Sequence, residues 1–248
     1  MKDFETRMRE FNELIAKSKR IVFFGGAGVS TDSGIPDFRS KDGLYNQKDV
    51  KFDSFTPEYL LSHSCLDKHP NVFFEFYRQK LDCRDIEPNI THKVLADMEA
   101  AGRLDCIITQ NIDGLHQKAG SKKVYEIHGT TYKNYCQDCF EECDADFIFN
   151  SKTDIPICPH CGGIVRPAVT LYEEMLPPDE WSGANAHISA ADLIIVGGTS
   201  LAVYPASNLI TYAPCPVVVI NKGELVNKVN AKIVFTEGLA EVFENIQY

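Results

Sequence analysis

The chain has 248 residues, 44% of them hydrophobic and 24% charged, which is typical of a globular protein with a sizeable core. No apolar run is long enough to cross a bilayer, so the sequence predicts no membrane insertion. The formal net charge of -10 argues against nucleic acid as a partner, because Lys and Arg supply most of that affinity, and it suits a basic, lysine-bearing protein segment.

At the start of the chain, apolar side chains three and four positions apart predict an amphipathic helix over residues 4–18. The charges around them alternate, and we find no apolar stretch of the kind that a secretory signal carries. The nine cysteines are an odd number in a chain of this length, which favours thiols in a reducing compartment. We therefore expect a cytoplasmic protein.

Short continuous apolar runs follow, and each predicts a parallel strand buried on both faces. They span residues 20–24, 106–109, 192–196, 216–220 and 232–235. Helical patterns lie beside them at about 90–101, 202–212 and 238–246. This alternation predicts an α/β fold, a Rossmann-like parallel sheet with helices on both faces, whose ligands bind beyond the carboxyl ends of the strands.

Two excursions interrupt the alternation. Residues 40–90 contain a charged loop and an aromatic-rich helical stretch at 71–80, and residues 130–168 contain paired cysteines. We expect both to build one smaller lobe, helical over 40–90 and a zinc ribbon over 130–168. The large lobe then comprises about residues 1–39, 91–129 and 169–248.

Two C-x-x-C pairs, separated by residues 140–157, match the spacing of a zinc ribbon and predict one structural zinc ion. Four thiolates fill the tetrahedral shell and leave no position for a catalytic water. His160 could replace one ligand, and Cys143 is a spare thiol, although neither is needed. The predicted ligands are Cys136, Cys139, Cys158 and Cys161.

The first predicted strand runs into the glycine-rich turn 25–30, where backbone N–H groups could approach a pyrophosphate. The full G-x-G-x-x-G spacing is absent, so an ordinary turn remains an alternative. The loop that follows, residues 31–39, is marked by Pro and Gly and brings together an acid, an aromatic ring and a guanidinium. Loops of this chemistry usually cover a ligand.

Polar residues also follow the later strands. The segment 109–113 reads Thr-Gln-Asn-Ile-Asp, His128 precedes the cysteines, and residues 197–200 and Asn221 follow two further strands. Strand-end capping by Asn and Asp is the simpler explanation for the first segment, and a single histidine is more often structural than catalytic.

Taken together, these motifs resemble the sirtuin family from about residue 10 to the end of the chain. The matching pieces keep their order along the chain. They are Gly26-Ala-Gly28-Val-Ser30, Gly34-Ile-Pro-Asp-Phe-Arg39, Thr109-Gln-Asn-Ile-Asp113-Gly-Leu-His116, His128-Gly129, the four cysteines, Arg166-Pro167, Gly198-Thr-Ser-Leu201 with Val203 and Pro205-Ala206, and Asn221.

The resemblance implies a single catalytic domain that removes acyl groups from protein lysines, with NAD as cosubstrate. In the family, nicotinamide leaves and the acyl group ends on ADP-ribose. His128 would be the general base and Asn111 would orient ribose or water. The residues implied in NAD binding are Ala27, Thr31, Phe38, Arg39, Gln110, Ile112, Asp113, His128, Thr199, Ser200, Asn221 and Leu239. The acyl-lysine peptide would bind as an added strand between the lobes, near 169–172 and Val203.

Two departures bear on specificity. Where the family often has Phe-Gly-Glu, this chain has Tyr172-Glu-Glu174, and the extra acid is expected to favour basic peptides. The desuccinylating members carry a Tyr-x-x-Arg pair, whereas the similar segment here is Tyr77-Arg-Gln-Lys80. Lysine cannot bind a carboxylate through two parallel hydrogen bonds as arginine does, so we expect deacetylation to exceed desuccinylation.

Three other functions are alternatives to protein deacetylation. ADP-ribosyl transfer to protein could use the same NAD site. A non-enzymatic zinc-ribbon module could bind nucleic acid or protein; for nucleic acid it should show a basic face, yet segment 136–161 carries six acids against Lys152 alone. A hydride-transferring dehydrogenase would need the G-x-G-x-x-G spacing.

Overall fold

A parallel sheet of six strands forms the larger part of the computed structural model, which describes residues 2–38, 40, 43–46, 51–211, 213–227 and 229–248. The strand order is β3-β2-β1-β7-β8-β9, and all neighbouring pairs run parallel. The strands are β1 (Ile21–Gly25), β2 (Cys106–Thr109), β3 (Val124–Glu126), β7 (Leu193–Gly197), β8 (Val217–Ile220) and β9 (Ala231–Phe235). Five of them were predicted as apolar runs; β3 was missed because it has three residues, all only partly buried.

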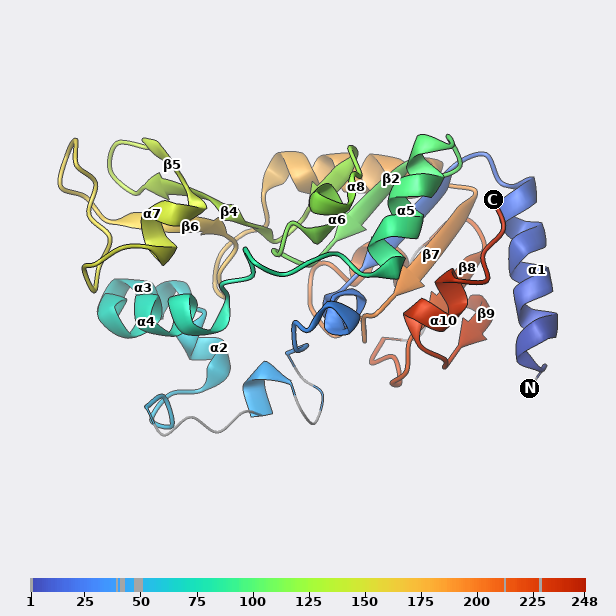
Figure 1. Cartoon of the computed structure of the whole chain (residues 1–248), viewed down its shortest axis with the longest axis horizontal. Coiled ribbons are helices and arrows are strands. Elements are labelled where there is room, and N and C mark those ends of the chain that lie inside the picture. The colour runs from blue at the N-terminus through green and yellow to red at the C-terminus, as the bar shows by residue number, and fades with distance from the viewer. Residues whose placement is uncertain (1, 39, 41–42, 47–50, 212, 228) are drawn as a thin grey trace.

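Helices cover both faces of this sheet, as predicted (Figure 1). One face packs on α1 (Phe4–Lys17), α5 (Ile90–Ala100) and α10 (Leu239–Phe243), and the other on α8 (Pro178–Ala190) and α9 (Asn208–Thr211). Successive side chains of a strand point to opposite faces, so Ile21 and Phe23 join the first core while Val22 and Phe24 join the second. This two-sided burial explains the continuous apolar runs of β1, β2, β7 and β8. The prediction of burial on both faces is wrong for β9, an edge strand that leaves Lys232 and Val234 exposed.

The helix predicted over 202–212 is wrong in its first part. The chain forms turns up to residue 207, and the helical residues described there are only those of α9. Pro205 has no backbone N–H and cannot donate inside a helix, so a helix starting at 202 would lack that bond. The predicted helix at 238–246 is shorter than expected, ending at Phe243.

The small lobe lies at the opposite end of the molecule from α1 (Figure 1). Its antiparallel sheet has the order β5-β4-β6, with β4 (Gly129–Cys136), β5 (Glu142–Asp144) and β6 (Val165–Val169). Beside this sheet stand α7 (Ala145–Phe149), α2 (Pro57–Leu60), α3 (His63–Lys68) and α4 (Pro70–Lys80). Both insertions therefore contribute to one lobe, while the lobe boundaries given above stay predictions. Within the described parts of the chain, no helix has the length and apolar character needed to span a membrane.

Candidate active site

The carboxyl ends of the strands lie level with one another. Gly25 of β1 pairs with Thr109 of β2 and with Gly197 of β7, while Thr109 pairs with Glu126 of β3 and Gly197 with Ile220 of β8. The segments that follow these residues therefore meet at one edge of the sheet. The polar motifs found in the sequence all leave from that edge.

Two glycine-containing turns touch backbone to backbone at this edge. The Gly28 N–H donates to the Gly198 carbonyl at 2.8 Å, and a Cβ added to Gly28 would lie 2.8 Å from the Gly198 Cα. Gly198 has φ of 60°, and a Cβ there would lie 2.5 Å from the Val29 nitrogen. Glycine is required at both positions because any side chain would separate the turns. The contact leaves a narrow floor of backbone beyond β1 and β7.

A chain of buried hydrogen bonds links this floor to the segment after β2. Asn111 Nδ2 donates to Ser30 Oγ at 3.0 Å, and Ser30 Oγ donates to Asp113 Oδ2 at 2.6 Å. The second carboxylate oxygen of Asp113 accepts from the Leu115 N–H at 3.0 Å. Burial raises the pKa of Asp113, although these donors act in the opposite direction. Ser30 was quoted within a motif but assigned no role, because its partners lie more than 80 positions away.

His128 stands just past the end of β3 with one ring nitrogen occupied. Its Nδ1 lies 3.0 Å from the Gln110 carbonyl oxygen. A carbonyl only accepts, so Nδ1 carries the hydrogen and Nε2 keeps its lone pair. Burial lowers the pKa of His128, while the bond to Gln110 acts to raise it. The imidazole is thus neutral at neutral pH, with its basic nitrogen fixed in direction.

Gly129 follows His128 directly and begins β4. Its φ is 77°, and an added Cβ would lie 2.1 Å from the Ala168 carbonyl oxygen. A side chain there would break the pairing of Gly129 with Val169. The His128 carbonyl in turn accepts from the Thr170 N–H at 2.8 Å. The histidine therefore sits where the large sheet passes into the small one.

Further predicted residues line the same edge. Gln110 Nε2 donates to Thr199 Oγ1 at 3.1 Å, which joins the segments after β2 and β7. Asn221, after β8, donates through Nδ2 to the Gly223 carbonyl at 2.8 Å. Ala27, Thr31, Ile112 and Ser200 belong to these same strand-end segments.

Two predicted residues, Phe38 and Leu239, pack against apolar side chains, and a third lies outside the described residues. Phe38 is partly buried in the small lobe, where its ring meets that of Tyr45 at 5.4 Å. Arg39 lies outside the residues that the structure describes. Leu239 has a side chain only 7% exposed, packed into the core near Gly197, so any contact with a ligand would have to come from its backbone.

Glu126 is a neighbour of His128 that sequence reasoning missed. It ends β3, two residues before the histidine, and its N–H donates to Glu180 Oε2 at 3.0 Å. Burial raises its pKa to about 7, so its charge changes close to neutral pH. Its place at the end of a strand was the available signal, but β3 was too short to be predicted.

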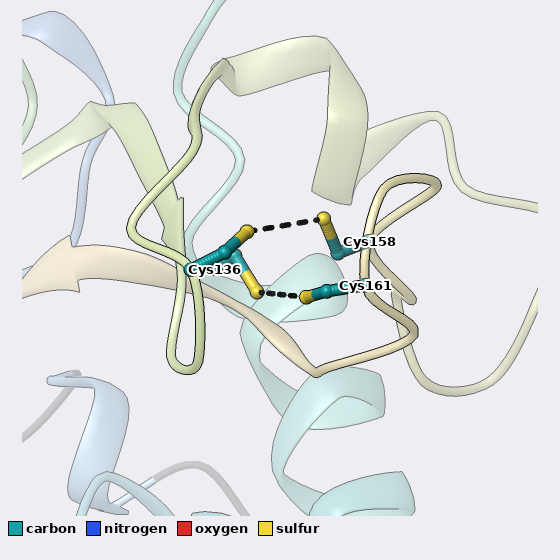
Figure 2. Close-up of side chains that lie close together, drawn as sticks. Cys136, Cys158 and Cys161 are labelled. Atoms are coloured by element: carbon teal, nitrogen blue, oxygen red, sulfur yellow. Dashed lines mark hydrogen bonds between the residues drawn. The ribbon is translucent and has the colours of Figure 1, made fainter.

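Four cysteine thiols face one another in the small lobe (Figure 2). The Sγ atoms of Cys136 and Cys161 are 3.4 Å apart and those of Cys139 and Cys158 are 3.7 Å apart. All four lie within 4.8 Å of one another. A tetrahedron with Zn–S bonds of about 2.3 Å has edges of about 3.8 Å, so the cluster fits zinc and not two disulfides.

The proposed spare ligands do not belong to that cluster. His160 instead approaches Glu141 at 3.7 Å, and its side chain is 66% exposed. Cys143 lies on β5, outside the group. A second group joins Asp105 and His187 with Cys106. The carboxylate of Asp105 already accepts from Lys123 at 3.0 Å and from His187 at 2.7 Å, so both of its oxygens are paired within the protein.

The segment after β6 is tied to both insertions. Buried Arg166 forms a two-pronged ion pair with Glu174, at 2.5 and 2.9 Å, and also donates to the Val169 carbonyl. Glu173 has φ of 76°, and its carboxylate accepts from the Ser64 N–H at 2.9 Å. Glu173, the acid that stands where the family often has glycine, therefore caps the start of α3 while remaining exposed.

Tyr77, the first residue of the segment compared with Tyr-x-x-Arg, is a core residue. It is fully buried, and its ring stacks on Phe73 and Phe149 with centroids 5.9 and 5.2 Å away. Its ring helps to hold the helical insertion against the ribbon insertion. The preference for acetyl over succinyl groups remains a prediction.

Comparison with known proteins agrees with this architecture. The family model described as "Sir2 family" matches residues 26–205. The NAD-dependent protein deacetylase of Clostridium acetobutylicum is 48% identical over 241 residues, covering 97% of this chain and 98% of the relative. That of Clostridium perfringens is 48% identical over 244 residues, covering 98% and 99%.

Solved structures give the same result. A complex of Sir2 with a p53 peptide and NAD+ superposes with a TM-score of 0.85 at 35% identity, covering 96% of this chain and 95% of that one. Sir2 bound to an acetylated peptide gives a TM-score of 0.85 at 33% identity over the same shares. The chain belongs to the Sir2 family.

Proposed function

We propose that the protein is a NAD-dependent protein-lysine deacetylase, which transfers the acyl group of a modified lysine to ADP-ribose and releases nicotinamide. The observation that carries this proposal is the fixed, neutral imidazole of His128 beside the buried Asn111–Ser30–Asp113 chain at the carboxyl edge of the sheet. The relatives named above support the same reaction class.

The strand-end cluster fits NAD. Its backbone floor at Gly28 and Gly198 can approach a pyrophosphate closely, because neither turn carries a side chain there. The buried carboxylate of Asp113 can accept from an amide N–H, and the side chains of Thr199, Ser200 and Asn221 can bind ribose hydroxyls. When bound, NAD supplies the leaving nicotinamide and the ribose that receives the acyl group.

The side chains of the chain would then act as follows. His128 would accept a proton at Nε2 from a ribose hydroxyl, since burial keeps the ring neutral and the Gln110 carbonyl holds its Nδ1–H. Asn111 would orient ribose or water, and Phe38 would exclude water from the reacting face. Because the pKa of His128 is lowered, kcat/KM should hold its plateau below the ordinary histidine pKa before it falls in acid.

We further propose that the acyl-lysine peptide binds as a strand between residues 169–172 and Val203, where backbone pairing reads lysine in many sequences. The thiol-rich metal site also suits a reducing compartment, which supports the cytoplasm as the place of action.

Replacement of His128 by Ala tests the proposal. We expect kcat to fall by about 10²- to 10⁴-fold on an acetylated peptide, with the affinity for NAD little changed. Mass spectrometry of the products should find free nicotinamide and acetylated ADP-ribose. Full activity in the variant would overturn the role of His128, and ADP-ribose attached to protein would favour ADP-ribosyl transfer instead.

A further inference from the structure

Asn89, the residue before α5, makes more contacts than a helix cap requires. Its Oδ1 accepts from the Thr91 N–H at 2.9 Å, and its own N–H donates to His92 Nδ1 at 3.3 Å, which closes a capping box. Its Nδ2 donates to the Val29 carbonyl at 2.8 Å and to Ser33 Oγ at 3.0 Å. The Asn89 side chain thus hydrogen-bonds both to the first turn of α5 and to the loop of residues 29–33, which is distant in the sequence.

The orientation of this amide is fixed by the helix. The first N–H groups of a helix have no partner inside the helix, so the oxygen must face Thr91 and the NH₂ group must face the loop. The helix itself is anchored, because Leu95 and Met98 are fully buried in the core. Asn89 is therefore a rigid donor pair and not a mobile surface amide.

The two loop acceptors stand on either side of Ser30, the residue whose hydroxyl connects Asn111 with Asp113. Fixing Val29 and Ser33 fixes the backbone between them, which leaves that hydroxyl within reach of both partners. Without Asn89, the loop would keep only its own backbone bonds and the hydrogen bonds of Ser30 and Thr31.

We propose that Asn89 is a positioning residue for the dinucleotide loop, holding residues 29–33 in the shape that binds NAD. This inference rests on the proposed function for its ligand. Asn89 does not itself touch the reacting atoms. It should therefore affect the binding of NAD more than the rate of the chemical step.

The decisive variant is Asn89→Ser, because serine caps helices about as well as asparagine but is too short to donate to the loop. We expect amide hydrogen exchange of residues 26–34 to accelerate in the free protein. The Kd for NAD, measured by calorimetry, and the KM for NAD should rise by about three- to tenfold, while kcat changes by less than about twofold. The KM for acetylated peptide should stay unchanged.

A second variant, Asn89→Asp, keeps the cap and the side-chain size but turns an acceptor toward the Val29 carbonyl, so its Kd for NAD should rise further. Asp3→Ala is the matched control, since it removes the cap of α1, at the far end of the molecule. It should lower Tm without changing the Kd.

Unchanged exchange and Kd in Asn89→Ser would overturn the inference, as would an equal rise in Kd for Asp3→Ala. Failure of the wild-type protein to bind NAD would instead overturn the proposed function. The exchange measurement would still decide whether Asn89 holds the loop.

Discussion

The two lobes of this protein are stabilised in different ways. The large lobe buries two continuous apolar cores, one on each face of its sheet. The core of the ribbon contains Cys136, Cys158 and Val165, with Cys143 and Phe147 partly buried against it. The helical insertion of the small lobe buries apolar clusters of its own, around Phe73 and Phe76. The large lobe therefore relies on burial, whereas the ribbon depends on its metal. The site lies where the large lobe meets this ribbon.

The largest effect should follow removal of the metal. Cys139→Ser, or treatment with a zinc chelator, should unfold the ribbon, because structural zinc contributes about 10 to 16 kcal/mol in small sites. Hydrogen exchange over residues 130–168 should become fast and deacetylation should be lost, while the large lobe still binds NAD. Cys143→Ser makes the same chemical change outside the cluster and should retain zinc and activity. If the ribbon stayed folded after metal loss, the proposed difference in how the large lobe and the ribbon are stabilised would be wrong.

A smaller effect is expected from a cavity in the large lobe. Phe235→Ala should lower the free energy of unfolding by about 3 to 5 kcal/mol, since this ring is fully buried against Phe4 and Phe11. Urea unfolding followed by circular dichroism measures the change, and the zinc content should stay constant. Phe140→Ala, on the ribbon and 71% exposed, is the control and should change stability by less than about 0.5 kcal/mol.

A loss of stability in acid should also arise in the large lobe, and the share of His92 in it is the smallest effect predicted. His92 and His116 lie 4.8 Å apart between α5 and α6 (Leu115–Ala119), and burial lowers the pKa of His92 to about 4 and that of His116 well below its usual value. Both rings are neutral at pH 7, folded or unfolded. Below about pH 6.5 only the unfolded chain takes up their protons, so stability falls as the pH drops toward 4.

His92 alone should account for about 3 kcal/mol of this loss. The variant His92→Gln tests it, because glutamine at this helix position can also accept from the Asn89 N–H but does not titrate. Its unfolding midpoint should depend less on pH between 6.5 and 4 than that of the wild type. Parallel pH profiles for the two proteins would rule out this origin.

The sequence predicted most strands of the large lobe but not all of its helices. Continuous apolar runs revealed β1, β2, β7 and β8 because both faces of the sheet are buried there. The edge strand β9 was found as well, although Lys232 and Val234 on its outer face are exposed. Helix α8 escaped detection because its buried residues are only Ala184 and Ile188, too few for a clear periodic pattern. The paired cysteines predicted the ribbon correctly, since metal ligation depends on local spacing.

For the site, the sequence located the strand-end segments but not their connections. The level strand ends bring Gln110 to Thr199 and Asn111 to Ser30, and each of these hydrogen bonds joins residues more than 80 positions apart. Neither pairing leaves a local signal. The same holds for Asn89, whose hydrogen bond to the Val29 carbonyl joins residues 60 positions apart.

The position of Gly129, at the junction of the two lobes, has a mechanical consequence. It joins the end of one sheet to the start of the other, and the adjacent residue is His128. When a rigid body rocks about a pivot, points near the pivot move least and distant points move most. A change in the tilt of the ribbon would therefore alter the proposed peptide site while leaving the imidazole of His128 almost in place. Different peptides would then meet the same base.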